Sequence, residues 1–208
     1  MKITLIDAGK RFNRDWIFRH LDYEFLPHRY YAITGPNGSG KSTLLQIIAG
    51  AIAATEGVVR YSAGSEIAPE HAYRQLSLSA PYLELIEEMT AIEFLRFHQA
   101  FKPFLPSHPL AAILGTVGLA AAAEKQIRFF SSGMKQRLKL AQAIFSASSV
   151  VLLDEPCTNL DAEGVALYQS LIRESGNGRL VIVSSNDPQE YDFCETVLDI
   201  RRFKQPQR

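Results

Sequence analysis

Glycines, a lysine and several hydroxyl residues gather in residues 34–43, TGPNGSGKST. Glycines let the backbone turn tightly enough for several N–H groups to point at one anion, and a helix that starts there adds its positive end. Lys41 would place its charge on phosphate, and the Ser42 hydroxyl is a suitable Mg²⁺ ligand. This spacing predicts a nucleoside triphosphate site, a P-loop. The residues that we expect to bind the phosphates are Gly35, Pro36, Asn37, Gly38, Ser39, Gly40, Lys41, Ser42 and Thr43.

The neighbouring sequence supplies the context that a P-loop needs. An apolar run, YYAIT, precedes the loop and predicts a buried strand, and a helical run follows at residues 43–49, with Gly50 placed to end it. A glycine-rich turn without a ligand is the alternative. A dinucleotide fingerprint is excluded, because Thr43 stands where its third glycine is required after Gly38 and Gly40.

Two carboxylates follow a second apolar run, VVLLDEP at residues 150–156. We expect Asp154 to complete the Mg²⁺ site together with Ser42, through water. Glu155 should point to the other side of the strand, where a carboxylate can orient or deprotonate an attacking water. A solvated strand end is the alternative interpretation of Glu155.

Two further segments complete a pattern. FSSGMKQRLKLAQAI follows at residues 130–144 and TNLD at residues 158–161. With the P-loop and VVLLDEP, these motifs occur in the order found in ABC-type ATPases, which the whole chain resembles. The resemblance implies that ATP is the nucleotide and that Lys41, Mg²⁺ and Glu155 act in its hydrolysis.

The resemblance also implies a homodimer with ATP at its interface. Ser131 and Gly133 match the family's signature segment, whose helix start contacts the γ-phosphate of ATP on the other subunit, while Ser132 replaces a glycine and Met134 a glutamine. Asp161 matches an aspartate that meets the partner's P-loop. For this segment alone, an ordinary helix N-cap at Ser131 or Ser132 is the alternative.

The chain departs from the family at two positions. Asn186, in VIVSSND, stands where a histidine normally contacts the γ-phosphate; its amide can donate a hydrogen bond but cannot titrate. The family's lid segment usually has a glutamine after the strand that corresponds to LSLSAP, and Ala80 or Pro81 occupies that place here. Both changes predict slower hydrolysis or altered coupling.

The family places an aromatic residue against adenine, and Phe12 matches it, with Trp16 as a less favoured substitute. Packing of Phe12 in a β layer is the alternative.

The composition predicts a cytoplasmic protein. The 208 residues contain 22 Lys and Arg and 22 Asp and Glu, so no net charge favours nucleic acid. Cys157 and Cys194 are too far apart for metal-ligand spacing, and the N-terminus lacks the apolar core of a signal peptide. The longest weakly polar stretch, residues 110–123, is too short to span a bilayer.

These motifs require an α/β fold. The alternation of Leu21, Tyr23 and Phe25 with acidic residues predicts an antiparallel β layer near the N-terminus, and the continuous apolar runs predict a mostly parallel central sheet. Helical spacing predicts an α-helical subdomain at about residues 83–140, inserted in a P-loop NTPase core that forms one domain, 1–208. The basic tail, residues 201–208, is predicted to be a frayed end.

The resemblance favours the ATP-hydrolysing subunit of a transporter, peripheral at the inner face of the cell membrane. Separate membrane-spanning subunits would dock at residues 81–89, with Tyr82, Leu83 and Leu85 as anchors; burial in the core is an equal alternative for the two leucines. The short chain favours export over import. The rival functions are a non-transport ABC ATPase and a nucleotide-gated interaction module with little hydrolysis.

Overall fold

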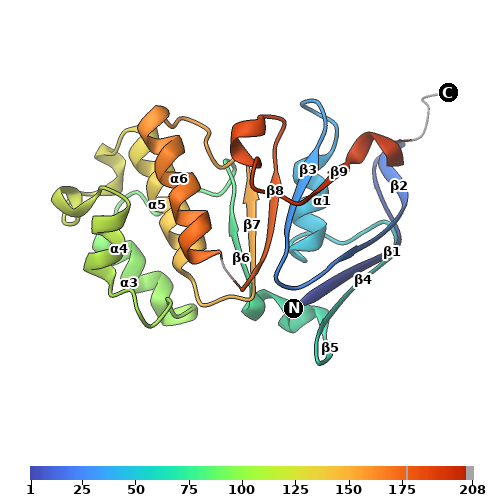
Figure 1. Cartoon of the computed structure of the whole chain (residues 1–208), viewed down its shortest axis with the longest axis horizontal. Helices are drawn as coiled ribbons and strands as arrows, with labels where there is room; N and C mark the ends of the chain where they lie inside the picture. The colour runs from blue at the N-terminus through green and yellow to red at the C-terminus, as the bar shows by residue number, and fades with distance from the viewer. Residues whose placement is uncertain (177, 205–208) are drawn as a thin grey trace.

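Two β-sheets and a group of helices make up the structure, a computed structural model that describes residues 1–176 and 178–204 (Figure 1). One sheet has strands in the order β2-β1-β4-β5, and the other in the order β6-β7-β8-β3-β9. The strands are β1 (Lys2–Phe12), β2 (Asp15–Phe25), β3 (Tyr30–Thr34), β4 (Glu56–Ala63), β5 (Ser65–Ile67), β6 (Leu76–Ser79), β7 (Val150–Asp154), β8 (Leu180–Ser184) and β9 (Thr196–Asp199). The predicted α/β fold class, with its parallel and antiparallel sheets, is confirmed.

The helices lie mainly between β6 and β7 and after the P-loop. The α-helices are α1 (Lys41–Ile48), α2 (Pro69–Ala72), α3 (Ala91–Phe101), α4 (Leu110–Thr116), α5 (Ser132–Phe145) and α6 (Ala162–Ser175). Short 3₁₀ turns are η1 (Tyr73–Gln75), η2 (Ala120–Ala122), η3 (Ile127–Phe129), η4 (Pro188–Glu190) and η5 (Ile200–Phe203).

The parallel sheet is buried on both faces, which explains its uninterrupted apolar runs. Val151 and Leu153 of β7 belong to the core that includes α5 and α6, whereas Val150 and Leu152 belong to the core that includes α1 and the antiparallel sheet. Successive residues of a strand point to opposite faces, so both must be apolar when both are covered. The parallel register places Asp154 opposite Ser184, so the carboxyl ends of these strands meet at one edge.

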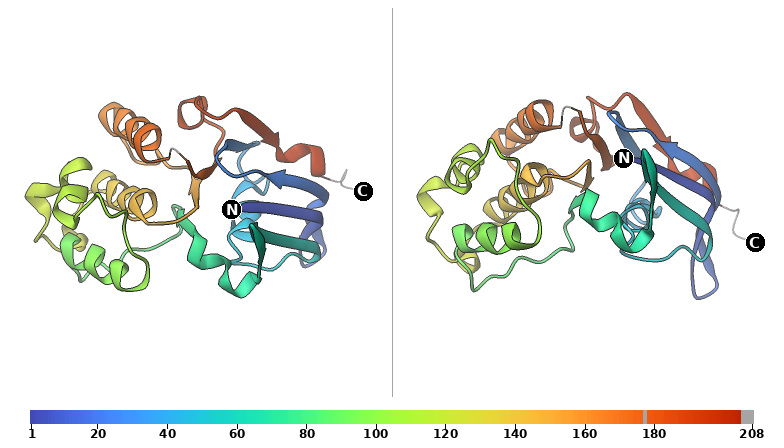
Figure 2. Two further views of the ribbon diagram at one scale, coloured as in Figure 1. Left: turned by 60° about the horizontal axis from the view of Figure 1, so that its bottom comes forward. Right: turned by 90° about the horizontal axis from the view of Figure 1, so that it is seen from below.

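The antiparallel sheet covers α1 on the side away from the other helices (Figure 2). Leu21 and Phe25 of β2 are fully buried in the core shared with α1, and Tyr23 packs against it. The alternation in the sequence therefore identified the buried face of this strand correctly.

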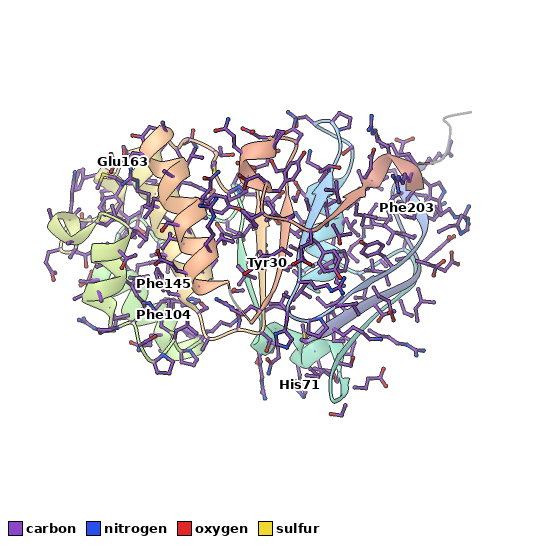
Figure 3. All side chains as sticks on the ribbon, in the orientation of Figure 1. Tyr30, His71, Phe104, Phe145, Glu163 and Phe203 are labelled. Atoms are coloured by element: carbon purple, nitrogen blue, oxygen red, sulfur yellow. The ribbon has the colours of Figure 1, made fainter. Side chains whose placement is uncertain are left out.

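Helices α3, α4 and α5 gather at the end of the molecule opposite the antiparallel sheet (Figure 1). Thr90 begins α3 with a capping box, because its hydroxyl accepts from the N–H of Glu93 while the Glu93 carboxylate accepts from the N–H of Thr90. Phe104 and Phe145 are buried among these helices (Figure 3). Helix α5 runs to Phe145, beyond the predicted limit of residue 140, and the division into a subdomain stays a prediction.

The basic tail begins as an ordered turn, which corrects the expectation of a frayed end for residues 201–204. Ile200 is fully buried, Phe203 packs against the core, and the Asp199 carboxylate accepts from the N–H of Arg201 at 3.0 Å. Residues 205–208 lie outside the described part of the chain. Within that part, no helix is both long and apolar enough to cross a membrane.

Candidate nucleotide site

The P-loop joins the end of β3 to the start of α1 through three glycines in the left-handed region. Gly35, Gly38 and Gly40 have φ of 147°, 72° and 103°, a conformation that side chains disfavour. A Cβ on Gly40 would lie 2.2 Å from Cγ2 of Ile17. Gly40 is also the N-cap of α1 and offers no side chain to its first N–H groups. The loop can therefore present backbone donors to an anion.

Lys41 is buried at the first position of α1, and its charge has only neutral partners among the described residues. Its Nζ donates to the carbonyl oxygen of Gly35 at 2.8 Å and to that of Pro36 at 3.4 Å. An ammonium bonded only to neutral carbonyl oxygens is well suited to a phosphate, because its bond to a charged oxygen is stronger than its bonds to these carbonyls.

A cavity of about 210 Å³ lies over the P-loop, lined by Ile17, residues 37–43 and Glu155. Glu155 enters it although it follows a straight strand, since its φ of 43° turns the chain sharply after Asp154. The N–H of Glu155 donates to the carbonyl oxygen of Ser184 at 2.8 Å and holds this turn against β8. Such a conformation is costly for a residue other than glycine and is often found at functional sites.

Asp154 is 1% exposed, and its Oδ1 has no hydrogen-bond partner within the described part of the chain. The hydroxyls of Ser39, Ser79 and Ser184 share this state, and all four residues lie in the P-loop or at the carboxyl ends of neighbouring strands. Buried polar atoms are normally satisfied by protein, water or a ligand. Mg²⁺ takes few protein ligands and keeps several waters, so Asp154 and Ser42 suit it.

Asn186 lies beside the P-loop, as the sequence predicts. Its Nδ2 donates to Oδ1 of Asn37 at 3.5 Å. Of the three residues predicted to act in catalysis, Lys41 and Glu155 line the P-loop cavity, and Asn186 contacts Asn37 of its lining.

The signature segment does not line this cavity. Ser131 is the N-cap of α5, and its Oγ accepts from the N–H of Met134 at 3.2 Å, so the alternative role of an ordinary cap is real for this residue. Ser132 and Gly133 form the first turn of α5. A separate cavity of about 430 Å³ is lined by Ser132 and other residues of α5, by residues of the segment 81–87, and by Thr158 and Asn159 of TNLD.

Asp161 caps α6, a local role that the sequence analysis did not assign to it. Its Oδ1 accepts from the N–H of Gly164 at 2.8 Å and faces Nη2 of Arg137 at 3.4 Å. The bond from Gly164 and then the charge of Arg137 lower the pKa of Asp161. The side chain is 73% exposed, so it stays accessible to another molecule.

Trp16 is covered by basic side chains. The guanidinium of Arg19 lies 4.4 Å from the indole centroid and that of Arg11 lies 5.3 Å from it. Cation–π contacts of this kind occupy ring surface that a base would need, and Phe12 has one as well, with Nζ of Lys10 5.0 Å from its ring centroid.

Phe12 lies on the other face of the β1–β2 hairpin. A bulge leaves Ile17 unpaired, so Lys10 pairs with Phe18 while Arg11 pairs with Trp16. Paired residues share a face, and Phe18 is core; Lys10 and Phe12, two residues apart, therefore face the core side, where α1 lies. Phe12 is 47% exposed at that edge. The adenine contact stays a prediction, to which the face and the exposure of Phe12 are suited.

Two apolar residues at the site were missed because nothing in their type indicates a ligand. Ile17 and Ile200 press on the P-loop, since a Cβ on Gly35 would lie 2.9 Å from Cγ2 of Ile200 and one on Gly40 would meet Ile17. They fix the shape of the loop and exclude larger residues from both glycine positions.

The predicted anchors of a membrane partner divide into two groups. Tyr82 and Leu83 are 44% and 37% exposed, whereas Leu85 is buried in the helical core. For Leu85 the alternative, burial in the chain's own core, is therefore correct. Cys157 is half-buried beside the site, and burial raises the pKa of its thiol, which disfavours a reactive thiolate.

Comparisons with known proteins agree with this geometry. Residues 18–158 match the ABC transporter family. The cytochrome c biogenesis ATP-binding export protein CcmA of Bartonella henselae is 32% identical over 181 residues, covering 85% of this chain and 84% of that protein. The zinc import ATP-binding protein ZnuC of Cereibacter sphaeroides is 33% identical over 190 residues, covering 89% and 74%.

A solved structure shares the fold. The dimeric, post-hydrolysis structure of the ATP-binding cassette MJ0796 bound to ADP and Pi superposes with a TM-score of 0.80 at 22% identity, over 95% of this chain and 94% of that one. The family match begins within β2 and runs past Asp154 and Glu155, so it includes every residue that lines the P-loop cavity except Ile17. This chain belongs to the ABC transporter family, as an ATPase that forms the ATP-binding subunit.

Proposed function

We propose that two copies of this chain bind ATP between them, hydrolyse it, and so drive separate membrane-spanning subunits. The observation that supports this best is that Lys41 and Glu155 line one cavity, which Asn186 borders through Asn37 and which the signature segment does not line. Each chain thus has one part of a site, and a second copy can supply the other.

The P-loop would hold the triphosphate through backbone N–H groups and Lys41. Ser42 and Asp154 would hold Mg²⁺, which supplies positive charge to the phosphate oxygens when bound. Glu155 would accept a proton from the attacking water, whose oxygen bonds to the γ-phosphorus as the bond to ADP breaks. The amide of Asn186 would donate to the γ-phosphate as a neutral group.

The second copy would contribute the start of α5, with Ser131, Ser132 and Gly133, and the carboxylate of Asp161. The cassette with the same fold is dimeric in its ADP- and phosphate-bound structure. Loss of the γ-phosphate contact on hydrolysis would release the interface, so that the two copies move apart.

The membrane subunits would dock near Tyr82 and Leu83, and the protein would then lie in the cytoplasm at the inner face of the membrane. We favour export, from the likeness to an export protein, although one relative is named for zinc import. Balanced charge argues against nucleic acid as a partner.

A nucleotide-gated module with little hydrolysis is the second candidate, and Asn186 is the observation that favours it. Phosphate release from ATP by the purified chain, alone and with the membrane protein that co-purifies from native extracts, separates the two. The proposal expects turnover that Glu155→Gln abolishes and that the membrane partner stimulates. If wild type hydrolyses ATP no faster than Glu155→Gln, both alone and with the membrane partner, the nucleotide-gated module is the function that remains.

A further inference from the structure

One peptide group in the loop after Glu155 is held at both ends by buried side chains. Nε2 of Gln136 donates to the carbonyl oxygen of Pro156 at 2.7 Å. The N–H of Cys157 donates to Oε1 of Glu190 at 2.7 Å. These two backbone groups belong to the same peptide bond, and the two side chains are only 3% and 5% exposed.

Because a peptide group is planar, fixing its C=O and its N–H fixes its orientation. Rotation of the Pro156–Cys157 peptide would break both hydrogen bonds and leave a buried carbonyl, amide and carboxylate unsatisfied. The preceding residue is Glu155, in its left-handed conformation with φ of 43°. The bonds of this peptide and the bond from the Glu155 N–H to Ser184 therefore restrain the Glu155 backbone from both sides.

The two side chains come from elements that are themselves firmly held. Gln136 lies in α5, three residues after Gly133. Glu190 ends η4, where its carbonyl oxygen accepts from the hydroxyl of the fully buried Tyr168 at 2.8 Å. Burial raises the pKa of Glu190, and hydrogen bonds from Ser185 and Cys157 oppose this.

We propose that Gln136 and Glu190 are positioning residues that set the direction of the Glu155 carboxylate by clamping the Pro156–Cys157 peptide. The proposal rests on the proposed function, in which Glu155 acts on water. A displacement of about 1 Å in a catalytic group lowers rates by roughly 100-fold. The clamp should thus affect the chemical step and leave ATP binding at the P-loop unchanged.

Steady-state ATP hydrolysis with Mg²⁺ tests this with matched variants. Gln136→Met and Glu190→Leu keep size but remove one bond each, and should lower kcat about 10- to 100-fold with KM for ATP within about threefold of wild type. Glu190→Gln keeps an oxygen for the Cys157 N–H and should restore kcat to within about threefold. Gln142→Met makes the same substitution on α5 away from the loop, where the bond lost is the one to His98, and should keep kcat within about threefold of wild type.

Amide hydrogen exchange at Cys157 gives a readout independent of activity. Protection should fall in Glu190→Leu and remain in Glu190→Gln. If Glu190→Leu does not fold, Glu190→Asp, whose shorter chain withdraws the oxygen, takes its place. Unchanged kcat in Gln136→Met and Glu190→Leu, or unchanged protection at Cys157, would overturn the clamp. Absence of ATP turnover in the wild-type chain would instead contradict the proposed function. Amide exchange at Cys157 in the Glu190 variants would still test whether the peptide is clamped.

Discussion

Lys41 and Asp154 show how single side chains prepare this site for a charged ligand. The ammonium has only carbonyl partners and one carboxylate oxygen has none among the described residues, although both side chains are buried. Buried charges are expensive unless they are paired. A bound triphosphate would pair with Lys41 and its Mg²⁺ with Asp154. The ligand would thus offset the cost of burying both charges.

Replacement of Phe12 by Ala should weaken ATP binding by roughly 5- to 150-fold, because base stacking on an aromatic ring contributes about 1–3 kcal/mol. Titration with a fluorescent ATP analogue measures this. Trp16→Ala is the control and should change the affinity less than twofold, since Trp16 lies on the other face of the hairpin. A larger loss in Trp16→Ala than in Phe12→Ala would reverse the assignment.

Asn186→His should raise the rate of ATP hydrolysis severalfold. A histidine can carry positive charge toward the γ-phosphate, which the present amide cannot. Phosphate release under saturating ATP is the measurement, with Asn186→Ala as the comparison that removes the donor altogether. Equal or lower turnover in Asn186→His would mean that the site is built around the amide and its contact with Asn37.

Packing of α3 against α5 depends on a neutral imidazole. His98 of α3 faces Oγ of Ser146 at 2.8 Å and Nε2 of Gln142 at 2.9 Å, both from the end of α5. Burial, and then the charge of Lys102, lower the pKa of His98 to about 4. Protonation would therefore strain the contact between these two helices.

The pH dependence of stability follows from this lowered pKa. The unfolded chain binds a proton near pH 6.5 and the folded chain only near 4, so the stabilising contribution is complete above 6.5 and is lost as the pH falls toward 4. The melting temperature of wild type should drop more between pH 7 and pH 4.5 than that of His98→Gln. His71→Gln, at an exposed histidine (Figure 3), should follow wild type. Parallel curves for wild type and His98→Gln would refute this.

Much of the architecture could be predicted from the periodicity of short segments. Uninterrupted apolar runs identified β3, β7 and β8, and alternation identified the buried face of β2, because burial on two faces or on one leaves different patterns. The P-loop residues and Asn186 could be placed because they follow strand ends. Glu155 could be assigned, but not the turn at φ of 43° that aims it.

Contacts between distant segments could not be predicted in this way. Gln136 and Glu190 meet one peptide from 20 and 33 residues away, and neither has a local pattern. The face that Phe12 occupies depends on the bulge at Ile17, which shifts the register without a sequence signal. The tail folds as η5 because Ile200 is buried against the P-loop, a contact between segments far apart in the chain.

In the proposed function, the whole chain carries two separate parts of an ATP site rather than one complete site. The start of α5 does not line the P-loop cavity, which contains Lys41 and Glu155, two groups expected to act in hydrolysis. A two-fold pair can bring each part to its complement.

Size-exclusion chromatography of Glu155→Gln with ATP and Mg²⁺ tests this pairing. Without hydrolysis the bound triphosphate should hold two chains together, giving about twice the monomer mass of 23.2 kDa. The same protein with ADP, and a double variant that also has Gly133→Glu at the start of α5, should elute as monomers. A single monomer peak for Glu155→Gln at saturating ATP, with nucleotide bound, would contradict a site shared between two copies.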